Sequence, residues 1–170
     1  AAEAWPQPAN PDEMHEALMS LGAISQAEGE ANPRWDLLLR QLAKAGRALR
    51  LADHKLWLAR ERLDLLLALY PAARLEPALE LLPGFDQAID ADSALSELLR
   101  ARLSGHGPQT QAQIAAPLGK SASDIGQALA RLETEGYVLR GHFSPGASDL
   151  QWCGRHLLAR LHRYTVKRLR

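Results

Sequence analysis

Apolar side chains at the start of the chain recur at helical spacing. The pattern predicts one helix that begins at Asn10, whose side chain can cap it, and ends at Gly22. A second helix is predicted over residues 33–46, where apolar side chains recur every three or four residues: Trp35, Leu38, Leu39 and Leu42. The polar residues 25–33 between the two helices are predicted to form a loop.

Over residues 47–59 the apolar and polar side chains alternate instead, which predicts a β-hairpin with its turn at residues 52–54. The leucines of both strands share one face: Leu49, Leu51, Leu56 and Leu58. The other face carries Arg50, Lys55 and Trp57. Helix, turn, helix and hairpin is the order of a winged helix.

The second half of the chain repeats this order. A helix over residues 94–103 and a short helix over 110–118 precede a longer helix that Ser121 or Ser123 caps. A hairpin over residues 137–153 then forms the wing. The glycine at the turn between the last two helices permits a sharp change of direction.

The patterns together predict a mainly α fold with short β-hairpin wings, made of tandem winged-helix modules. The predicted segments are a lead-in loop (1–10), a first winged-helix-like module (11–70), a linker (71–93), a second module (94–153) and a basic amphipathic helix (154–170). The chain begins without Met and stops within this last helical pattern, so we expect it to be part of a larger protein.

Charge is divided unevenly along the chain. The 170 residues hold 20 basic and 20 acidic side chains, which excludes a uniformly basic nucleic-acid binder. Residues 1–100 carry a net charge of −6, however, and residues 101–170 carry +6. Such an asymmetry indicates an interaction surface in the basic part.

Composition also limits the compartment. The single cysteine, Cys153, excludes an internal disulfide framework and a cysteine-rich zinc site. No apolar run approaches the roughly 18 to 20 residues that span a bilayer, and the start of the chain lacks the pattern of a signal peptide. We therefore expect a cytoplasmic, nucleoid-associated protein with no membrane contact.

Catalytic motifs are not found in the sequence. Residues 119–121 resemble the end of a phosphate-binding loop, but Ile114 stands where that motif needs glycine and the preceding segment is helical. The six histidines are scattered rather than set at metal-ligand spacing. We therefore predict that this segment has no catalytic site, metal or cofactor of its own.

Trp57 is the first candidate for nucleic-acid contact. It lies opposite the leucine face of its hairpin, so it is predicted to be exposed beside Arg50 and Lys55. An exposed indole among cations is typical of a platform on which an unpaired base stacks. The alternative is that Trp57 packs against a neighbouring domain. The position of Trp152 in its strand predicts that it points toward the core. Trp35 is also predicted in the core, and Trp5 is predicted to anchor the lead-in loop.

Two helices are the other candidates. The outward face of the longer helix in the second module carries Gln127 and Arg131 and could enter a major groove, or it could pack against protein. The C-terminal helix has a basic stripe suited to backbone phosphates: His156, Arg160, Arg163, Lys167 and Arg170. The alternative for this stripe is a solvated face over an apolar seam against further domains.

Two stretches carry a family resemblance. The run EGYVLRGHFSPG…WCGRHLLARLHRYTVKRLR, with KLWLARERL upstream, resembles the region after the motor domains in the bacterial large helicase-related (Lhr) family of superfamily 2 DNA helicases. The resemblance extends from about Asp12 to Arg170 and is most specific over residues 135–170. His156 stands where the family pattern has an arginine, which weakens a phosphate role at that position.

The resemblance implies a role within a larger helicase. Family members carry two RecA-like ATPase domains, which bind ATP and Mg²⁺, and translocate 3′ to 5′ on single-stranded DNA. The chain would be part of the accessory region, with single-stranded DNA or a DNA/RNA hybrid and the RecA-like domains as partners, in DNA repair. A tryptophan of the family's accessory region stacks on the tracking strand; Trp57 is the candidate here and Trp152 the alternative.

Two other functions fit the same pattern. One is a structural scaffold that packs on the motor domains or associates with itself, and it predicts that protein covers Trp57 and the basic stripe. The other is a stand-alone transcriptional regulator, which would require a stable dimer and a palindromic operator.

Overall fold

The computed structural model describes residues 5–78, 89–146 and 149–157. We call residues 5–78 the N-terminal module, and the described residues from 89 to 157 the C-terminal module. The N-terminal module contains α1 (Pro11–Leu21), β1 (Ile24–Ser25), α2 (Gln26–Ala31), α3 (Trp35–Lys44), β2 (Ala48–Leu51), β3 (Leu56–Ala59), the 3₁₀ helix η1 (Arg60–Arg62), α4 (Leu63–Leu69) and β4 (Leu75–Glu76). The C-terminal module contains α5 (Ala91–Gly105), β5 (Gln109–Thr110), α6 (Gln111–Ala115), η2 (Ala116–Leu118), α7 (Ala122–Thr134), β6 (Val138–Gly141) and β7 (Gln151–Gly154).

Each module holds a small antiparallel sheet. The strand order is β1-β3-β2-β4 in the N-terminal module and β5-β7-β6 in the C-terminal module. In both sheets the short strand that follows the first helix pairs with the last strand of the hairpin. The predicted fold class, mainly α with short β-hairpins, is confirmed, and the order helix, strand, two helices and hairpin occurs twice.

Two predicted caps define where helices begin. The Asn10 side chain accepts a hydrogen bond from the Glu13 N–H at 2.9 Å, and Pro11 occupies the first turn of α1. Ser121, rather than Ser123, caps α7 by accepting from the N–H of Asp124 at 3.1 Å. Both helix starts therefore follow from local side-chain chemistry.

Two segments differ from the prediction. Residues 25–33 are not a loop: they contain α2, because Ser25 and Glu28 form a capping box in which each side chain accepts from the other residue's N–H. The predicted linker over residues 71–93 contributes β4, which pairs with β2 at the edge of the N-terminal sheet, and the first residues of α5.

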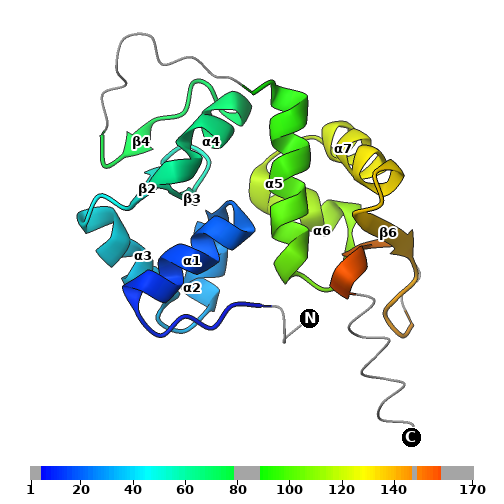
Figure 1. Ribbon diagram of the computed structural model, residues 1–170, viewed down its shortest axis with the longest axis horizontal. Helices are drawn as coiled ribbons and strands as arrows, with labels where there is room; N and C mark the ends of the chain where they lie inside the picture. The colour runs from blue at the N-terminus through cyan, green and yellow to red at the C-terminus, as the bar shows by residue number, and fades with distance from the viewer. Residues whose placement is uncertain (1–4, 79–88, 147–148, 158–170) are drawn as a thin grey trace, which may run out of the picture.

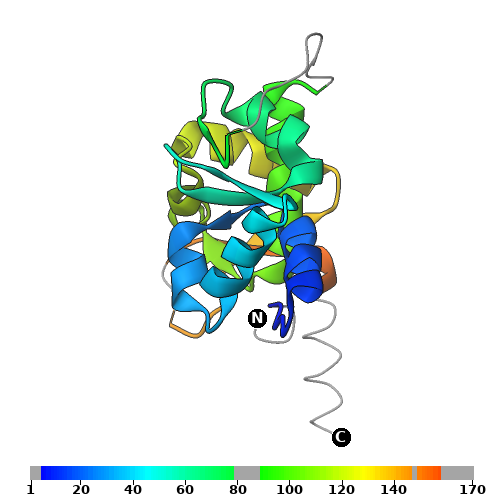
Figure 2. The same ribbon diagram turned by 90° about the vertical axis from the view of Figure 1, so that its left-hand side faces the viewer.

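The N-terminal sheet is covered on both faces (Figure 2). On one face Ala48, Trp57 and Ala59 pack with side chains of α1 and α3. On the other face the hairpin leucines pack with α4 and with α5 and other elements of the C-terminal module. The sheet is therefore a middle layer of the molecule rather than an outer wing.

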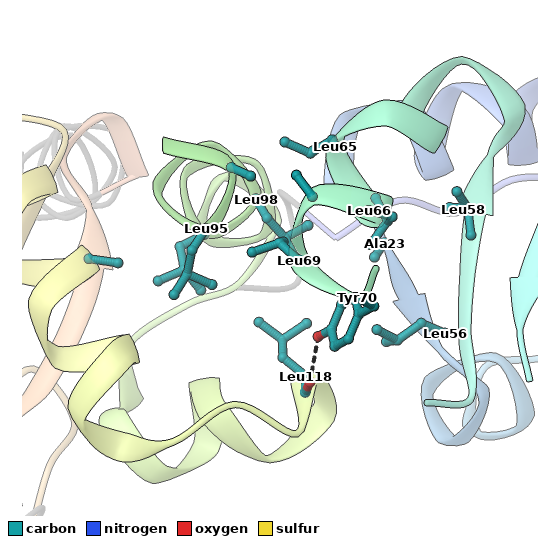
Figure 3. Close-up of a cluster of buried hydrophobic side chains, with 14 of the residues drawn as sticks. Ala23, Leu56, Leu58, Leu65, Leu66, Leu69, Tyr70, Leu95, Leu98 and Leu118 are labelled. Carbon is teal, nitrogen blue, oxygen red and sulfur yellow. Dashed lines mark hydrogen bonds between the residues drawn. The ribbon is translucent and has the colours of Figure 1, made fainter. Parts of the chain in front are cut away.

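One hydrophobic core joins the two modules, and α5, the first helix of the C-terminal module, lies along their boundary (Figure 1). Figure 3 shows leucines of β3, α4 and α5 meeting around Tyr70, whose hydroxyl donates to the Leu118 carbonyl of η2 at 2.5 Å. Lys120 Nζ donates to the carbonyl of Leu69 at 2.6 Å and lies 4.4 Å from the Tyr70 ring centroid. Because apolar burial and these bonds cross the boundary, the modules pack as one unit.

Candidate nucleic-acid interface

The prediction that Trp57 is exposed is wrong. Its side chain is only 6% exposed, in the cluster formed with α1 and α3. Strand alternation does separate Trp57 from the leucines, as predicted, but it cannot show what covers each face. Here α4 and α5 cover the leucine face while α1 and α3 cover the Trp57 face, so no base can stack on this indole in the structure described.

Arg50 is engaged within the protein. Its Nε and Nη2 donate to one carboxylate oxygen of Glu76 at 3.1 and 2.6 Å, and its Nη1 donates to the Gln26 side chain at 2.5 Å. Glu76 belongs to β4, a strand that the sequence analysis did not predict. Its carboxylate offsets the charge that was expected to attract phosphate.

Lys55 is exposed in the hairpin turn, at a backbone φ of +52°. It lines a cleft of about 510 Å³ between α2 and η2, together with Glu28, Glu30 and His54. Glu28 is paired with Arg102, but Glu30 adds a negative charge that makes this cleft an unfavourable place for a phosphate backbone. The predicted cluster of Trp57, Arg50 and Lys55 is therefore not assembled as an exposed cationic platform.

The outward face of α7 is exposed as predicted. Gln127 and Arg131 are both accessible, while the opposite face of the helix packs Ile125, Leu129 and Leu132 into the core. Among the residues that the structure describes, Arg131 forms no ion pair. The pKa of Asp90 is lowered mainly by hydrogen bonds from Ser93 and also by the positive charge of Arg131, which places that charge near the start of α5.

An exposed aromatic residue lies at the end of α7, beside two arginines. Tyr137 is 40% exposed, and the Arg100 guanidinium lies 3.7 Å from its ring centroid. Arg155 Nη1 lies 3.4 Å from the position that a Cβ on Gly136 would occupy, and the Arg155 N–H donates to the Tyr137 carbonyl at 2.9 Å. We call Arg100, Tyr137 and Arg155 the Arg-Tyr cluster.

No sequence pattern singled out the Arg-Tyr cluster. Two features of the sequence pointed toward it. Tyr137 precedes the buried Val138, so its side chain lies on the opposite face of the strand, and Arg100 lies on the polar face of the predicted helix over residues 94–103. The contact between Arg100 and Tyr137 joins two segments far apart in the sequence, so spacing alone could not reveal it. Neither Arg100 nor Arg155 forms an ion pair within the described part of the chain.

The wing of the C-terminal module presents mixed chemistry. Arg140 pairs with Glu133 at 3.1 Å and lies 5.8 Å from the ring centroid of Trp152, which is buried as predicted. Leu139 and Leu150 are 39% and 42% exposed. This sheet, unlike the N-terminal one, therefore keeps large side chains accessible.

The basic stripe lies almost wholly outside the described residues. Residues 155–157 are helical, and His156 is exposed. Arg160, Arg163 and Lys167, three of the predicted phosphate contacts, lie beyond residue 157, as does Arg170.

A buried polar cluster fixes the N-terminal module to α5. Arg102, whose side chain is 5% exposed, donates to Glu28 at 2.7 and 3.1 Å and to the Ala23 carbonyl at 2.7 Å. His106 Nε2 lies 3.3 Å from the Glu28 carboxylate, and the His106 ring packs edge-on against Trp5 at 4.5 Å between centroids.

The electrostatics of this cluster favour the ionised carboxylate. Burial alone raises the pKa of Glu28, but the hydrogen bond with His106, the charge of Arg102 and further hydrogen bonds outweigh burial. They hold the pKa of Glu28 far below its ordinary value of 4.5. The cluster serves to orient the modules, since protein groups already occupy its polar atoms.

The described residues offer little to other classes of site. No group of three or more His, Cys, Asp or Glu side chains in this part of the chain is placed to hold a metal ion. No helix among these residues is both long enough and apolar enough to cross a membrane. We find no match to the chain among protein-family models or among curated proteins.

Proposed function

We propose that this chain is a DNA-binding accessory segment that contacts single-stranded DNA through its C-terminal module. The observation that carries the proposal is the Arg-Tyr cluster, an exposed ring with one guanidinium at 3.7 Å and a second beside the preceding glycine. Single-strand binding combines aromatic rings, on which bases stack, with cations that follow the backbone. Tyr137 would supply the ring, and Arg100 and Arg155 the phosphate contacts.

Two neighbouring features extend this surface. Gln127 and Arg131 on α7 would contact the strand or an adjoining duplex, because both side chains are exposed. The basic side chains of the final segment follow directly after Arg155 in the sequence and would add phosphate contacts. Arg50 and Lys55 have a smaller part in this proposal, since Arg50 is paired with Glu76 and Lys55 lies in a cleft with Glu30.

The resemblance to Lhr helicases supplies the proposed context. Its most specific stretch, residues 135–170, contains Tyr137 and Arg155. In that context the parent protein is an ATP-dependent 3′-to-5′ DNA helicase of the nucleoid, and its RecA-like domains bind ATP and Mg²⁺. The described residues would then hold single-stranded DNA, or the DNA of a DNA/RNA hybrid, beside the motor.

Binding of a fluorescent oligothymidine by the chain, followed by anisotropy at about 50 and about 200 mM salt, tests the proposal. Replacing Tyr137 by Ala removes the stacking surface and should weaken binding about 5- to 150-fold, while Tyr137→Phe should retain it. Arg155→Ala should reduce the salt slope by about 0.7.

Arg40→Ala is the matched control, because Arg40 is an exposed arginine of the N-terminal module that pairs with Asp36 four residues earlier. It should leave the affinity and the salt slope unchanged. Equal affinity of the wild type and Tyr137→Ala would rule out the Arg-Tyr cluster as the binding site.

A scaffold role is the second candidate, and one observation favours it. The N-terminal sheet has protein on both faces, yet α3 keeps Leu37 60% exposed on its outer side. Leu37→Ser should then weaken association with RecA-like domains in a pull-down, whereas Tyr137→Ala should not. The reverse result would favour the DNA-binding role alone.

A further inference from the structure

The helix pair α2–α3 of the N-terminal module is built like the pair α6–α7 of the C-terminal module. In each pair a capping box starts the short first helix, with Ser25 and Glu28 at α2 and with Thr110 and Gln113 at α6. The second helix of each pair then buries side chains at one shared spacing: Trp35, Leu38, Leu39 and Leu42 in α3, and Ile125, Ala128, Leu129 and Leu132 in α7. Two helices in this order form a helix-turn-helix, whose second helix can enter the major groove of duplex DNA.

The outer side of α3 is open to solvent. Its exposed side chains include Leu37 and Gln41 in the middle of the helix, Lys44 at its end and Arg34 just before its start. We call these four residues the α3 face. Figure 1 shows α3 and α7 at opposite sides of the molecule, with β6 on the side of α7, so the α3 face is separate from the Arg-Tyr cluster.

The α3 face carries positive charge that the described part of the chain does not neutralise. Asp36 is the one acidic residue of α3, and it is paired with Arg40 at 3.0 Å. Arg34 and Lys44 form no ion pair with any residue that the structure describes. Two unpaired cations on one side of a helix favour a polyanion over the RecA-like partner considered above, for which the exposed Leu37 was the observation.

We infer that the α3 face is a second nucleic-acid site, which binds duplex DNA in the major groove. Arg34 and Lys44, at the two ends of the helix, would contact backbone phosphates and fix the helix in the groove. Gln41 can donate to and accept from the edge of adenine, and Leu37 can contact the methyl group of thymine. The inference goes beyond the proposed function, in which a different ligand, single-stranded DNA, binds the C-terminal module.

Two labelled duplexes of one sequence, made of DNA and of RNA, test the inference by fluorescence anisotropy. Their phosphate charge is similar, but the major groove of the RNA duplex is too deep and narrow for side chains to read. The chain should therefore bind the DNA duplex more tightly. Lys44→Ala removes one phosphate contact, so it should weaken binding of the DNA duplex and reduce its salt slope by about 0.9.

Arg34→Gly provides a variant in which a loss of binding is not a loss of folding. Arg34 has a backbone φ of +70°, which glycine adopts without strain, so this change removes the cation and favours the native backbone. It should also reduce the salt slope for the DNA duplex by about 0.9, with an unchanged circular dichroism spectrum. Arg74→Ala is the matched control, because Arg74 is an exposed arginine of the same module that pairs with Asp53. It should leave the slope as it is.

Unchanged duplex affinity in both Arg34→Gly and Lys44→Ala would overturn the inference, and so would equal affinity for the two duplexes. If both variants lost association with RecA-like domains but kept duplex binding, the α3 face would be a protein-binding surface and the inference would fail.

Tyr137→Ala separates this inference from the proposed function. It should weaken oligothymidine binding and leave duplex affinity unchanged. If it removed duplex binding as well, one surface of the C-terminal module would serve both ligands, and the α3 face would not be a site. If Tyr137→Ala bound oligothymidine like the wild type while Lys44→Ala weakened duplex binding, the proposed function would fail and the α3 face would stand.

Discussion

The two modules share an order of elements and differ in what covers their sheets. In the N-terminal module every side chain of β3 is buried, and both faces of the sheet pack against helices. In the C-terminal module β6 exposes Leu139 and Arg140, and Tyr137 just before the strand is 40% exposed. One arrangement of secondary structure therefore forms an internal layer in one place and a free surface in the other.

The difference follows from the hairpin sequences. The strands of the first hairpin carry leucine on one face and Trp57 with alanines on the other, so each face stabilises the fold by being buried. The second hairpin buries Val138 and Trp152 but leaves Leu139 exposed on the opposite face and Arg140 exposed beside Trp152. A ligand-binding surface is therefore expected in the C-terminal module.

The largest expected effect comes from breaking the polar cluster between the modules. Arg102→Leu leaves the Glu28 carboxylate without its cation in a mostly buried site, and should lower the free energy of unfolding by about 3–5 kcal/mol. Urea denaturation followed by circular dichroism measures it. The same change at Arg40, whose side chain is 66% exposed, should stay within about 1 kcal/mol.

Glu28→Gln in the Arg102→Leu background provides a second check. With no unpaired carboxylate left, the double variant should recover part of the lost stability. Equal stability of Arg102→Leu and the wild type would mean that apolar packing alone holds the modules together.

A smaller contrast is expected between the leucines of the two hairpins. Leu58 is fully buried in the shared core, so Leu58→Ala should cost about 2–5 kcal/mol. Leu139 is 39% exposed, and the same substitution there should cost less than about 1 kcal/mol. Similar losses of unfolding free energy for the two variants, measured by urea denaturation, would contradict the conclusion that the first hairpin is covered and the second is exposed.

Local sequence signals predicted much of this fold. The caps Asn10 and Ser121, the two hairpins and the opposite faces of Trp57 and the leucines all depend on neighbouring residues, and each was found in the structure. The capping box over Ser25–Glu28 is equally local and shows which signal the loop prediction overlooked.

The candidate site was less predictable because it depends on contacts between distant segments. Alternation placed Trp57 opposite the leucines but could not reveal that α1 and α3 cover one face while α4 and α5 cover the other. β4 brings Glu76 onto Arg50 from 26 residues away, and Arg100 reaches Tyr137 from another helix. Gln127 and Arg131 were placed correctly because helix periodicity alone decides their exposure.

Low pH should weaken the Glu28–Arg102 contact between the modules. The pKa of Glu28 is lower in the folded protein than its ordinary value of 4.5, so its contribution to stability is complete above pH 4.5 and is lost as the pH falls below that value. The stability difference between the wild type and Glu28→Gln should therefore narrow in acid. Urea denaturation from about pH 7 to about pH 3 follows it, and a constant difference would show that Glu28 does not titrate with folding.

The smallest expected difference concerns two turn glycines: Gly22, where the modules are in contact, and Gly119, in the C-terminal module. Gly22 and Gly119 have φ values of +77° and +62°, so alanine is strained at both positions, at about 1 kcal/mol. A Cβ on Gly22 would also lie 2.9 Å from Leu98 Cδ1, a side chain packed in the shared core, whereas a Cβ on Gly119 meets nothing within 4 Å. Gly22→Ala should therefore lose about 1–3 kcal/mol more than Gly119→Ala in thermal or urea unfolding. Equal losses of stability in the two variants would mean that α1 and α5 can move apart to accept the added methyl group. The packing between the modules would then be less tight than the contact of Gly22 with Leu98 implies.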